Sequence, residues 1–396
     1  QLNGRIISET NEKRFKLMND SFGGIKEVLF LGRESYFIKF FNQKGRSLSY
    51  SRATNQVLAQ VPRYFLELMA FGSMIALLLY LIASYNGNLG IILPIISAYA
   101  FVAFKLIPAF HQIYGYLAEI KGNIAAFETI KQDLIDSQKT KLMLSKHNQD
   151  ILYPKKQIIV DNLTFAYPNT EKKTISNLNL FIPANNIVGI VGPSGSGKST
   201  LIDILLGLIK PENGFIKIDE KIIDDNNCRS WQDAIGFVAQ RIFLLDKSIA
   251  ENVAFGVPSE QINLQKVQKA LDLANLTEFV QSLKEGIHTR VGERGVQLSG
   301  GQCQRIGIAR ALYNKPKVLI FDEATSSLDG ITEKAIMKAI HSLSGRKTII
   351  IIAHRLKTVQ KCDHIFFINK GKVVDQGTYQ KLINTNKDFK NMAEHA

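Results

Sequence analysis

The 396-residue sequence predicts a multidomain chain in which an all-α part made of long helices precedes an α/β part. Two apolar runs, residues 64–84 and 89–110, indicate the helical part, since each is long enough to cross a hydrocarbon core of about 30 Å. Residues 187–191 indicate the α/β part, because this apolar, β-branched run predicts a buried strand. A glycine-rich loop and an apolar helix follow the strand, an order that is typical of doubly wound sheets.

The composition limits the partners and the environment of the chain. A net charge of +14 and a pI near 9.5 permit nucleic acid or an anionic membrane surface as a partner. A mean hydropathy near zero, in a chain with 49 Lys and Arg residues, indicates that apolar residues are concentrated in particular segments. The widely spaced Cys228, Cys303 and Cys362 suit a reducing compartment and support neither a disulfide framework nor a zinc site. Because the chain opens on Gln1 without a secretory signal pattern, we expect a fragment or a lost start.

The first segment, residues 1–63, predicts strongly charged helices. Apolar residues recur at helical spacing between Ile25 and Phe40, which predicts one continuous helix face. The pair Gly23 and Gly24 predicts a break or a bend before that face.

The two apolar runs together predict a transmembrane hairpin, residues 64–110. Each run contains one charged residue, Glu67 in the first and Lys105 in the second, and the connector 85–88 contains none. Lysines and arginines precede the first run and follow the second, so the positive-inside rule places both flanks in the cytosol and the connector outside. The alternative is a buried helical hairpin within a large soluble domain.

Glu67 and Lys105 have two interpretations. They can form a substrate or proton site. We favour the other interpretation, in which both snorkel from the cytosolic ends of their spans and Glu67 pairs with Arg63 one turn away. Pro94 and Pro108 can kink the second span.

Helical spacing continues from residue 111 to about 138, and the polar stretch 136–154 predicts a linker. Strands are expected at 157–167 and 175–182, on either side of a polar turn. Tyr167, at the end of the first of these strands, can stack on an adenine base or simply pack.

The loop after residue 191 matches the nucleotide-binding pattern G-x-x-x-x-G-K-[S/T] at every fixed position. Its backbone N–H groups can surround phosphate oxygens, and the helix expected over 200–207 adds the positive end of its dipole. Lys198 can reach the outer phosphates, and the Ser199 hydroxyl can hold Mg²⁺. A chance glycine-rich turn is the alternative, which the flanking strand and helix disfavour. We therefore expect ATP or GTP to bind the loop residues Gly192, Pro193, Ser194, Gly195, Ser196, Gly197, Lys198 and Ser199.

Two carboxylates end a second apolar strand, residues 318–322. Asp322 can hold the Mg²⁺ shell, and Glu323 can orient or deprotonate the attacking water. A third apolar strand, residues 348–352, is followed by His354, which can contact the γ-phosphate or be structural.

Residues 298–302 place a serine and two glycines before a helix expected over 303–313, and so make a second anion site. One chain has little use for two such sites on one nucleotide. A pair of chains can use both sites, because the loop of one chain can close on the γ-phosphate held by the other. With these residues the chain resembles ABC transporters of the exporter type, in which membrane and nucleotide-binding domains are fused, over essentially its whole length.

The resemblance implies a role for each matched residue. The loop residues just named form the Walker A motif, followed by Thr200, and Asp322 is the Walker B carboxylate. The catalytic group would comprise Glu323 as the base, the switch histidine His354 and the Q-loop residue Gln240, which also approaches the metal. The remaining nucleotide contacts would be the adenine-stacking Tyr167, the signature residues Ser299, Gly300, Gly301 and Gln302, and the D-loop Asp329, while residues 291–295 resemble an X-loop. Cys303 departs from the family, which often has a basic residue there.

The resemblance also implies a domain plan. Residues 1–63 are similar to the intracellular loop between the fourth and fifth spans, with a coupling helix near residues 7–18. Residues 111–156 form a cytosolic helix and a linker, and residues 157–396 form the ATP-binding domain with a helical subdomain at about 241–314. The chain is expected to be the C-terminal portion of a longer half-transporter.

The implied activity is ATP-driven export or flipping of an amphipathic substrate, with ATP and Mg²⁺ bound between two chains of a head-to-tail homodimer. Residues 23–35 look similar to bacterial flippases of lipid-linked oligosaccharides, although lipid, drug or peptide export stays open. Membrane lipids are expected partners of an integral, multi-pass protein of the bacterial inner membrane with a cytoplasmic ATPase domain. Two alternatives are an ATP-gated channel and a soluble ABC ATPase acting on nucleic acid or ribosomes. The apolar hairpin disfavours the soluble ATPase, so no nucleic-acid partner is expected.

Overall fold

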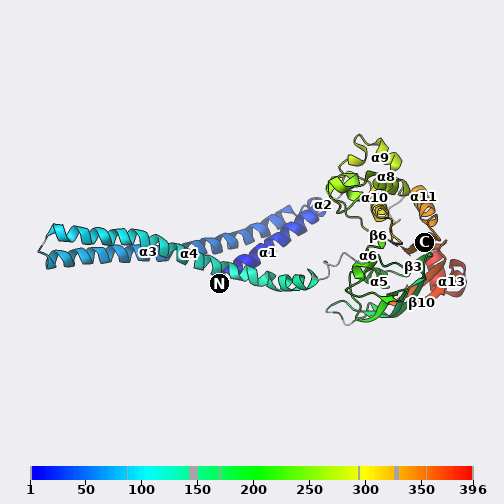
Figure 1. Ribbon diagram of the computed structural model, residues 1–396, viewed down its shortest axis with the longest axis horizontal. Coiled ribbons are helices and arrows are strands. Elements are labelled where there is room, and N and C mark those ends of the chain that lie inside the picture. Colours follow the sequence, from blue (N-terminus) through cyan, green and yellow to red (C-terminus); the bar gives the residue numbers. More distant parts are fainter. Residues whose placement is uncertain are drawn as a thin grey trace. The chain divides into compact units, whose positions relative to one another are not determined.

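The computed structural model describes residues 2–86, 88–141, 150–168, 170, 172–292, 295–324, 330–353 and 355–394, and Figure 1 shows its helices and strands. The chain divides into two compact units, Gln1–Leu142 and Met143–Ala396. The first is helical and the second is α/β, as the sequence predicts. The finer boundaries expected at residues 63, 110 and 156 stay predictions.

The described residues of the first unit form the helices α1 (Leu2–Gly23), α2 (Ile25–Phe30), α3 (Glu34–Ser84) and α4 (Leu89–Lys141). The break predicted at Gly23 and Gly24 is confirmed. The single helix face expected from Ile25 to Phe40 is wrong, because a second break separates α2 from α3.

Gly32 causes this second break. It adopts a left-handed φ of 61°, which costs glycine little because it has no Cβ. Its N–H donates to the Leu29 carbonyl at 3.2 Å and the Arg33 N–H to the Val28 carbonyl at 2.9 Å. This pair of bonds is the Schellman ending of a helix.

Helices α3 and α4 are antiparallel and run side by side in Figure 1. By length and composition, Glu34–Ser84 and Leu89–Lys121 can each cross a membrane, and only 6% of the apolar window of each is buried in the structure. This exposure does not support the buried-hairpin alternative. Arg63 Nε donates to Glu67 Oε1 at 2.8 Å, which confirms the predicted pair. Both helices continue without interruption through their prolines, Pro62 in α3 and Pro94 and Pro108 in α4.

Helix α4 also continues farther than the sequence suggested, to Lys141, so the linker expected from residue 136 begins too early. The side chain of Gln132 donates to Asp136 one turn later at 3.1 Å, and Ser137 Oγ donates to the Leu134 carbonyl at 2.8 Å. Polar residues that bond along the helix in this way do not end it, although their composition resembles that of a linker.

Two sheets form the centre of the second unit. The first is antiparallel and has the order β2-β1-β4-β5, and the second has the order β10-β9-β3-β8-β7-β6. Within the second sheet β9, β3, β8, β7 and β6 are parallel and only β10 is antiparallel. The strands of the first sheet are β1 (Gln157–Phe165), β2 (Ile175–Pro183), β4 (Asn213–Ile218) and β5 (Lys221–Ile222); those of the second are β3 (Ile187–Val191), β6 (Ile235–Val238), β7 (Val318–Asp322), β8 (Thr348–Ala353), β9 (His364–Asn369) and β10 (Lys372–Gly377).

The parallel strands are buried on both faces, which explains their continuous apolar runs. The side chains of β3 and β7 alternate between two hydrophobic cores, one on each face of the sheet. Val188 and Ile320 pack in a core shared with the first sheet and with α5 (Lys198–Leu205). Ile187 and Leu319 pack in the other core, which also contains α10 (Gly300–Tyr313).

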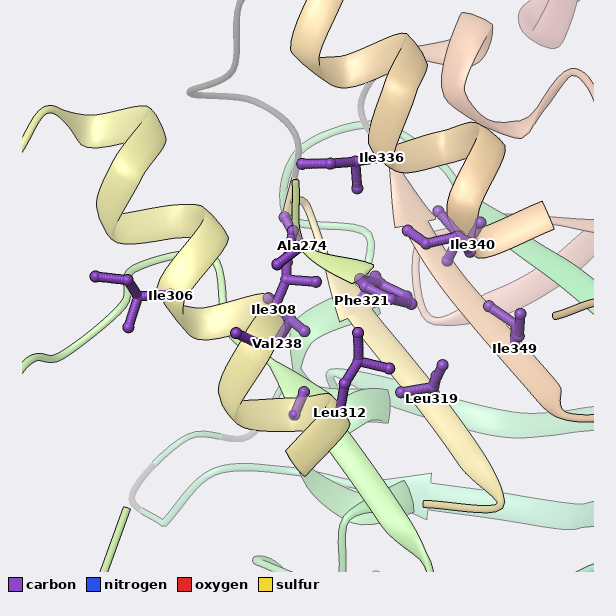
Figure 2. Close-up of a cluster of buried hydrophobic side chains, with 14 of the residues drawn as sticks. Val238, Ala274, Ile306, Ile308, Leu312, Leu319, Phe321, Ile336, Ile340 and Ile349 are labelled. Carbon is purple, nitrogen blue, oxygen red and sulfur yellow. The ribbon is translucent and has the colours of Figure 1, made fainter. Parts of the chain in front are cut away.

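Figure 2 shows part of this second core, where Ile308 and Leu312 of α10 lie close to Val238 of β6 and to strand β7. The helical subdomain predicted at 241–314 contains α7 to α10. The other helices of the unit are α6 (Cys228–Gln232), α7 (Ile249–Val253), α8 (Leu264–Leu273), α9 (Thr277–Ser282), α11 (Gly330–His341), α12 (Leu356–Val359), α13 (Tyr379–Thr385) and α14 (Lys387–Glu394), with 3-10 turns at Ser259–Gln261 and Gly286–His288.

Candidate nucleotide-binding site

The candidate site lies where four neighbouring parallel strands end. Strands β3, β8, β7 and β6 are adjacent, so their carboxyl ends meet at one edge of the sheet. Gly192 follows β3, Glu323 follows β7 and Gln240 lies just beyond β6. This edge is where doubly wound sheets bind ligands.

The glycine loop needs its glycines for two different reasons. Gly195 and Gly197 have left-handed φ values of 73° and 101°. At Gly192 a Cβ would lie 2.0 Å from the Ile368 carbonyl oxygen, so no side chain fits there. Helix α5 begins at Lys198, earlier than the predicted 200, because Gly197 itself is the N-cap. The lysine therefore belongs to the first turn of the helix, where free N–H groups attract anions.

Lys198 is buried and its ammonium group faces back into the loop. Its Nζ donates to the carbonyls of Gly192 at 2.8 Å and Pro193 at 2.9 Å. Burial lowers the pKa of Lys198, and the nearby Glu323 and Asp322 oppose that shift. The loop thus surrounds a cation at the position where the resemblance places the outer phosphates.

Ser196 adds an unsatisfied polar atom to the loop. Its hydroxyl oxygen is buried and has no hydrogen-bond partner in the part of the chain that the structure describes. Buried hydroxyls without partners are uncommon in folded proteins. A phosphate oxygen would satisfy this group, so the loop fits a nucleotide phosphate chain.

Asp322 and Glu323 are held differently. The pKa of Asp322 is raised to about 6, chiefly by burial and further by the negative charges of Glu323 and Asp203. The positive charge of Lys198 lowers this pKa in part. Glu323 has a left-handed φ of 49°, and its Oε2 accepts a 2.8 Å hydrogen bond from Gln240 Nε2. The two predicted acidic residues and Gln240 are therefore brought together, whereas their roles toward a nucleotide stay predictions.

Asp203 is the residue that the sequence reasoning missed. It lies one turn beyond Ser199 on α5, and it contributes to the raised pKa of Asp322. The spacing of four residues from Ser199 was the available signal, since such residues share a helix face.

The donor set fits a magnesium ion. A hydroxyl on Ser199, a carboxylate on Asp322 and an amide oxygen on Gln240 are the hard oxygen ligands that Mg²⁺ prefers. Among the described residues no group of three or more His, Cys, Asp or Glu side chains can hold a metal.

Tyr167 lies beside the loop at the start of α5. Its hydroxyl is 3.1 Å from Thr200 Oγ1, and its ring meets the Phe165 ring edge-on at 5.1 Å. Tyr167 remains 44% exposed. Stacking on adenine stays a prediction.

The second anion loop ends in a helix cap. Ser299 is the N-cap of α10, with its Oγ accepting from the Gln302 N–H at 3.3 Å while Gln302 Oε1 accepts from the Ser299 N–H at 2.8 Å. The predicted start of this helix at 303 is wrong, because the cap makes Gly300 and Gly301 its first turn. Cys303 is half-buried, and burial raises the pKa of its thiol.

Several predicted site residues lie outside the described residues. They are the switch histidine His354, the D-loop Asp329, and Glu293 and Arg294 of the X-loop.

Comparisons with known proteins agree with this geometry. Residues 175–326 match the ABC transporter family, which implies that the second unit binds ATP. The chain is 33% identical over 387 residues to the ATP-dependent lipid A-core flippase of Alkalilimnicola ehrlichii, covering 94% of this chain and 62% of the relative. It is 40% identical over 274 residues to the alpha-hemolysin translocation ATP-binding protein HlyB of Escherichia coli, covering 69% of this chain and 37% of the relative.

A solved structure of a bacterial Atm1-family ABC exporter with ATP bound shares the fold, with a TM-score of 0.82 and 27% identity. The match covers 100% of this chain and 70% of the solved chain. The chain spans 62% to 64% of the length of three curated flippases that it matches. Residues 175–326 therefore form an ABC transporter ATP-binding domain that follows long apolar helices, and the chain shares the fold of a solved ABC exporter.

Proposed function

We propose that this chain forms part of a half-transporter that uses ATP hydrolysis to export or flip an amphipathic substrate across a membrane. The observation that carries the proposal is the joining, in one chain, of two exposed apolar helices to an ATP-binding unit. The names of the relatives, a lipid A-core flippase and a hemolysin translocation protein, support export as the reaction class.

The site residues suggest how hydrolysis proceeds. Ser199, Asp322 and Gln240 would hold Mg²⁺, which supplies charge compensation on the phosphates. Lys198 exchanges the carbonyls of Gly192 and Pro193 for phosphate oxygens, since an ammonium bonds more strongly to an anion than to neutral carbonyls. Glu323 accepts a proton from water as the water oxygen bonds to the γ-phosphorus and ADP leaves.

A second chain would complete each site. The cap between Ser299 and Gln302 uses the N–H groups of these two residues, and the N–H groups of Gly300 and Gly301 in the first turn of α10 are those that would attract a phosphate. Their own chain already provides a phosphate loop at the start of α5. We therefore propose a head-to-tail homodimer in which the α10 loop of each chain meets the nucleotide of the other.

We place the coupling segment at α2 and its flanking turn, in place of residues 7–18. Helix α1 runs without interruption through residues 7–18, whereas α2 is a short helix between two breaks. Phe30 is 89% exposed and Leu31 is 63% exposed at its end. Exposed apolar residues of this kind mark a docking surface.

The bacterial flippase relatives support a location in the bacterial inner membrane. The basic flanks of the spans favour the cytosolic side and so support a cytoplasmic ATP-binding unit. Lipids would surround α3 and α4, whose apolar side chains are largely exposed.

Transport by the full-length protein in sealed vesicles tests the proposal. Vesicles that contain fluorescent lipid-linked saccharides, phospholipids or amphipathic drugs should show ATP-dependent translocation of one class. Lys198→Ala should abolish it, because the loop loses its phosphate-binding cation, while Lys221→Ala on β5 should not. ATP hydrolysis without translocation of any class would contradict export.

Polypeptide export is the second candidate. The identity of 40% to the hemolysin translocation protein favours it, although that match covers only 37% of the relative. Stimulation of ATP hydrolysis by amphipathic peptides and not by lipids would support this candidate over a flippase.

A further inference from the structure

The turn between β9 and β10 contacts the glycine loop. It consists of Lys370 and Gly371, and the flanking residues Asn369 and Lys372 pair across the two strands. Both turn residues have left-handed backbones, with φ values of 47° and 73°. Two left-handed residues in succession are typical of the type I′ turn, which joins antiparallel strands tightly. We call these two residues the β9–β10 turn.

Gly371 binds the glycine loop through its backbone. It is buried, and its N–H donates to the Ser196 carbonyl at 3.0 Å. Its own carbonyl accepts a 3.0 Å hydrogen bond from the N–H of Ser176, near the start of β2. A Cβ at residue 371 would lie 2.4 Å from the Thr174 carbonyl oxygen, so no side chain fits there. The β9–β10 turn is therefore held between β2 and the glycine loop.

Two further residues of the glycine loop pack against the same surroundings. Gly192 faces the Ile368 carbonyl at the end of β9, as described above. A Cβ at Gly197 would lie 2.9 Å from the Thr174 carbonyl oxygen and 3.7 Å from the Gly371 Cα. The end of β9, the β9–β10 turn and the residue before β2 therefore support the glycine loop along its length.

The hydrogen bond from Gly371 fixes one peptide group of the loop. The carbonyl of Ser196 and the N–H of Gly197 belong to the same trans peptide group, so they point in opposite directions. Because the Ser196 carbonyl points to the β9–β10 turn, the Gly197 N–H points away from it. This N–H has no backbone acceptor among the residues that the structure describes.

The same peptide group holds two donors that suit a phosphate. Gly197 is the N-cap of α5, where N–H groups without partners attract anions. Ser196 is only 3% exposed, and its hydroxyl oxygen is buried without a hydrogen-bond partner in the described part of the chain. Both donors depend on the orientation that the Gly371 N–H gives to the Ser196 carbonyl.

We propose that Gly371 is a positioning residue for ATP, which directs the Gly197 N–H to a nucleotide phosphate through its hydrogen bond to the Ser196 carbonyl. The β9–β10 turn orients this peptide group before ATP binds, and such preorganisation favours binding. The proposal rests on the proposed function, because it requires a nucleotide in the glycine loop. It predicts that disturbing the turn weakens the binding of the phosphates and leaves the binding of the nucleoside unchanged.

Gly371→Ala in the full-length protein tests the turn. The new Cβ meets the Thr174 carbonyl and moves the N–H away from Ser196. The affinity for a fluorescent ATP analogue should fall about tenfold, the size expected for a lost hydrogen bond to an anion. Binding of fluorescent adenosine, which has no phosphate, should not change. The KM for ATP should rise while kcat stays near the wild-type value, because binding is lost equally in the ground and transition states.

Gly345→Ala is the matched control. Gly345 lies between α11 and β8, has a left-handed φ of 75°, and donates its N–H to the Asn185 carbonyl at 3.0 Å. A Cβ there would have no atom within 4 Å. This variant carries the same backbone strain and should bind ATP with the wild-type affinity.

A pair of variants at the exposed Lys370 decides the test if Gly371→Ala does not fold. Both remove the charge of the lysine. Lys370→Val disfavours the left-handed backbone because valine is β-branched, whereas Lys370→Asn tolerates it. The valine variant should therefore lose ATP affinity, and the asparagine variant should keep it.

Three results would contradict these proposals. Wild-type ATP affinity in Lys370→Val and in any folded Gly371→Ala protein would overturn the role of the turn. Equal losses of affinity for fluorescent ATP and fluorescent adenosine would also overturn it, because they would show a general disturbance of the unit. A wild-type protein that binds no ATP would instead overturn the proposed function.

Discussion

At the scale of single residues, the charged side chains of the candidate site are hydrogen-bonded to other groups of the protein. Lys198 bonds to two loop carbonyls, and Glu323 bonds to Gln240. These contacts satisfy charged groups that burial would otherwise penalise. The hydrogen-bond partners just named are neutral, so phosphates, a metal ion and water can replace them in these contacts.

Glu323→Gln should keep ATP binding and abolish steady hydrolysis. The amide oxygen can still accept the hydrogen bond from Gln240, so the geometry is kept, but it cannot take a proton from water. Loss of a general base typically lowers the rate by about 10²- to 10⁴-fold. Phosphate release and binding of a fluorescent ATP analogue measure the two effects in the full-length protein. Glu285→Gln, on an exposed turn, is the control, and wild-type hydrolysis by the Glu323 variant would disprove the assignment.

Mg²⁺ binding should weaken as the pH falls through 6. The pKa of Asp322 is raised to about 6, chiefly by burial, so below this pH the free site carries a protonated acid that must lose its proton to bind a cation. The apparent Mg²⁺ affinity should then fall by about tenfold per pH unit. Calorimetric Mg²⁺ titrations with ADP present, between pH 5 and 8, measure this dependence.

Asp322→Asn provides the comparison for that titration. The variant cannot bind the competing proton at residue 322, so its pH dependence reports the other titrating groups, ADP and Asp203 among them. An identical pH dependence in wild type and variant would exclude Asp322 as the titrating metal ligand.

At the scale of elements, the cap of α10 shows how a helix end becomes a possible interface. Ser299→Arg should leave ATP binding by each chain intact and prevent ATP-dependent association of the two ATP-binding domains. The arginine removes the hydroxyl that caps Gln302 and places bulk and charge at the helix start. Ser282→Arg at the end of α9 is the matched control. ATP-dependent cross-linking of the full-length chains measures the association, which must differ between the two variants if the prediction is correct.

The sequence predicted the strands more accurately than the helix ends. Strands buried on both faces, such as β3 and β8, are continuous apolar runs, and each was recognised from that run alone. The starts of α5 and α10 were placed too late because Gly197 and Ser299 act as caps. The spacing of Ser299 and Gln302 is a capping-box pattern that could have located the start of α10, whereas the cap Gly197 has no side chain that could give such a signal. Gly32 was missed for a similar reason, since only its left-handed backbone ends α2.

The residues of the candidate site differ in how far the sequence alone predicts them. The glycine loop and the two acids have fixed spacings that identify them. The hydrogen bond between Gln240 and Glu323 joins residues far apart in the sequence, and only the order of strands β6 and β7 brings them together. The position of Asp203 near Asp322 depends in the same way on how α5 packs against the sheet, which no local pattern contains.

At the scale of the whole molecule, the direction of the hairpin decides whether ATP and the substrate can be coupled. Helices α3 and α4 join through residues 85–88, which carry no charge, while basic residues gather at their far ends. Moving charged segments through the bilayer is costly, so the connector should face outside and the ATP-binding unit the cytosol.

Cysteine labelling tests this direction. Asn88→Cys should react with a membrane-impermeant maleimide added to intact cells, because the connector is expected outside. Ser137→Cys near the end of α4 should react only after the cells are permeabilised. Cys228, Cys303 and Cys362 lie in the second unit and should likewise be protected in intact cells, so they serve as internal controls. Labelling of Ser137→Cys in intact cells, with Asn88→Cys protected, would reverse the hairpin and separate the ATP-binding unit from its nucleotide supply.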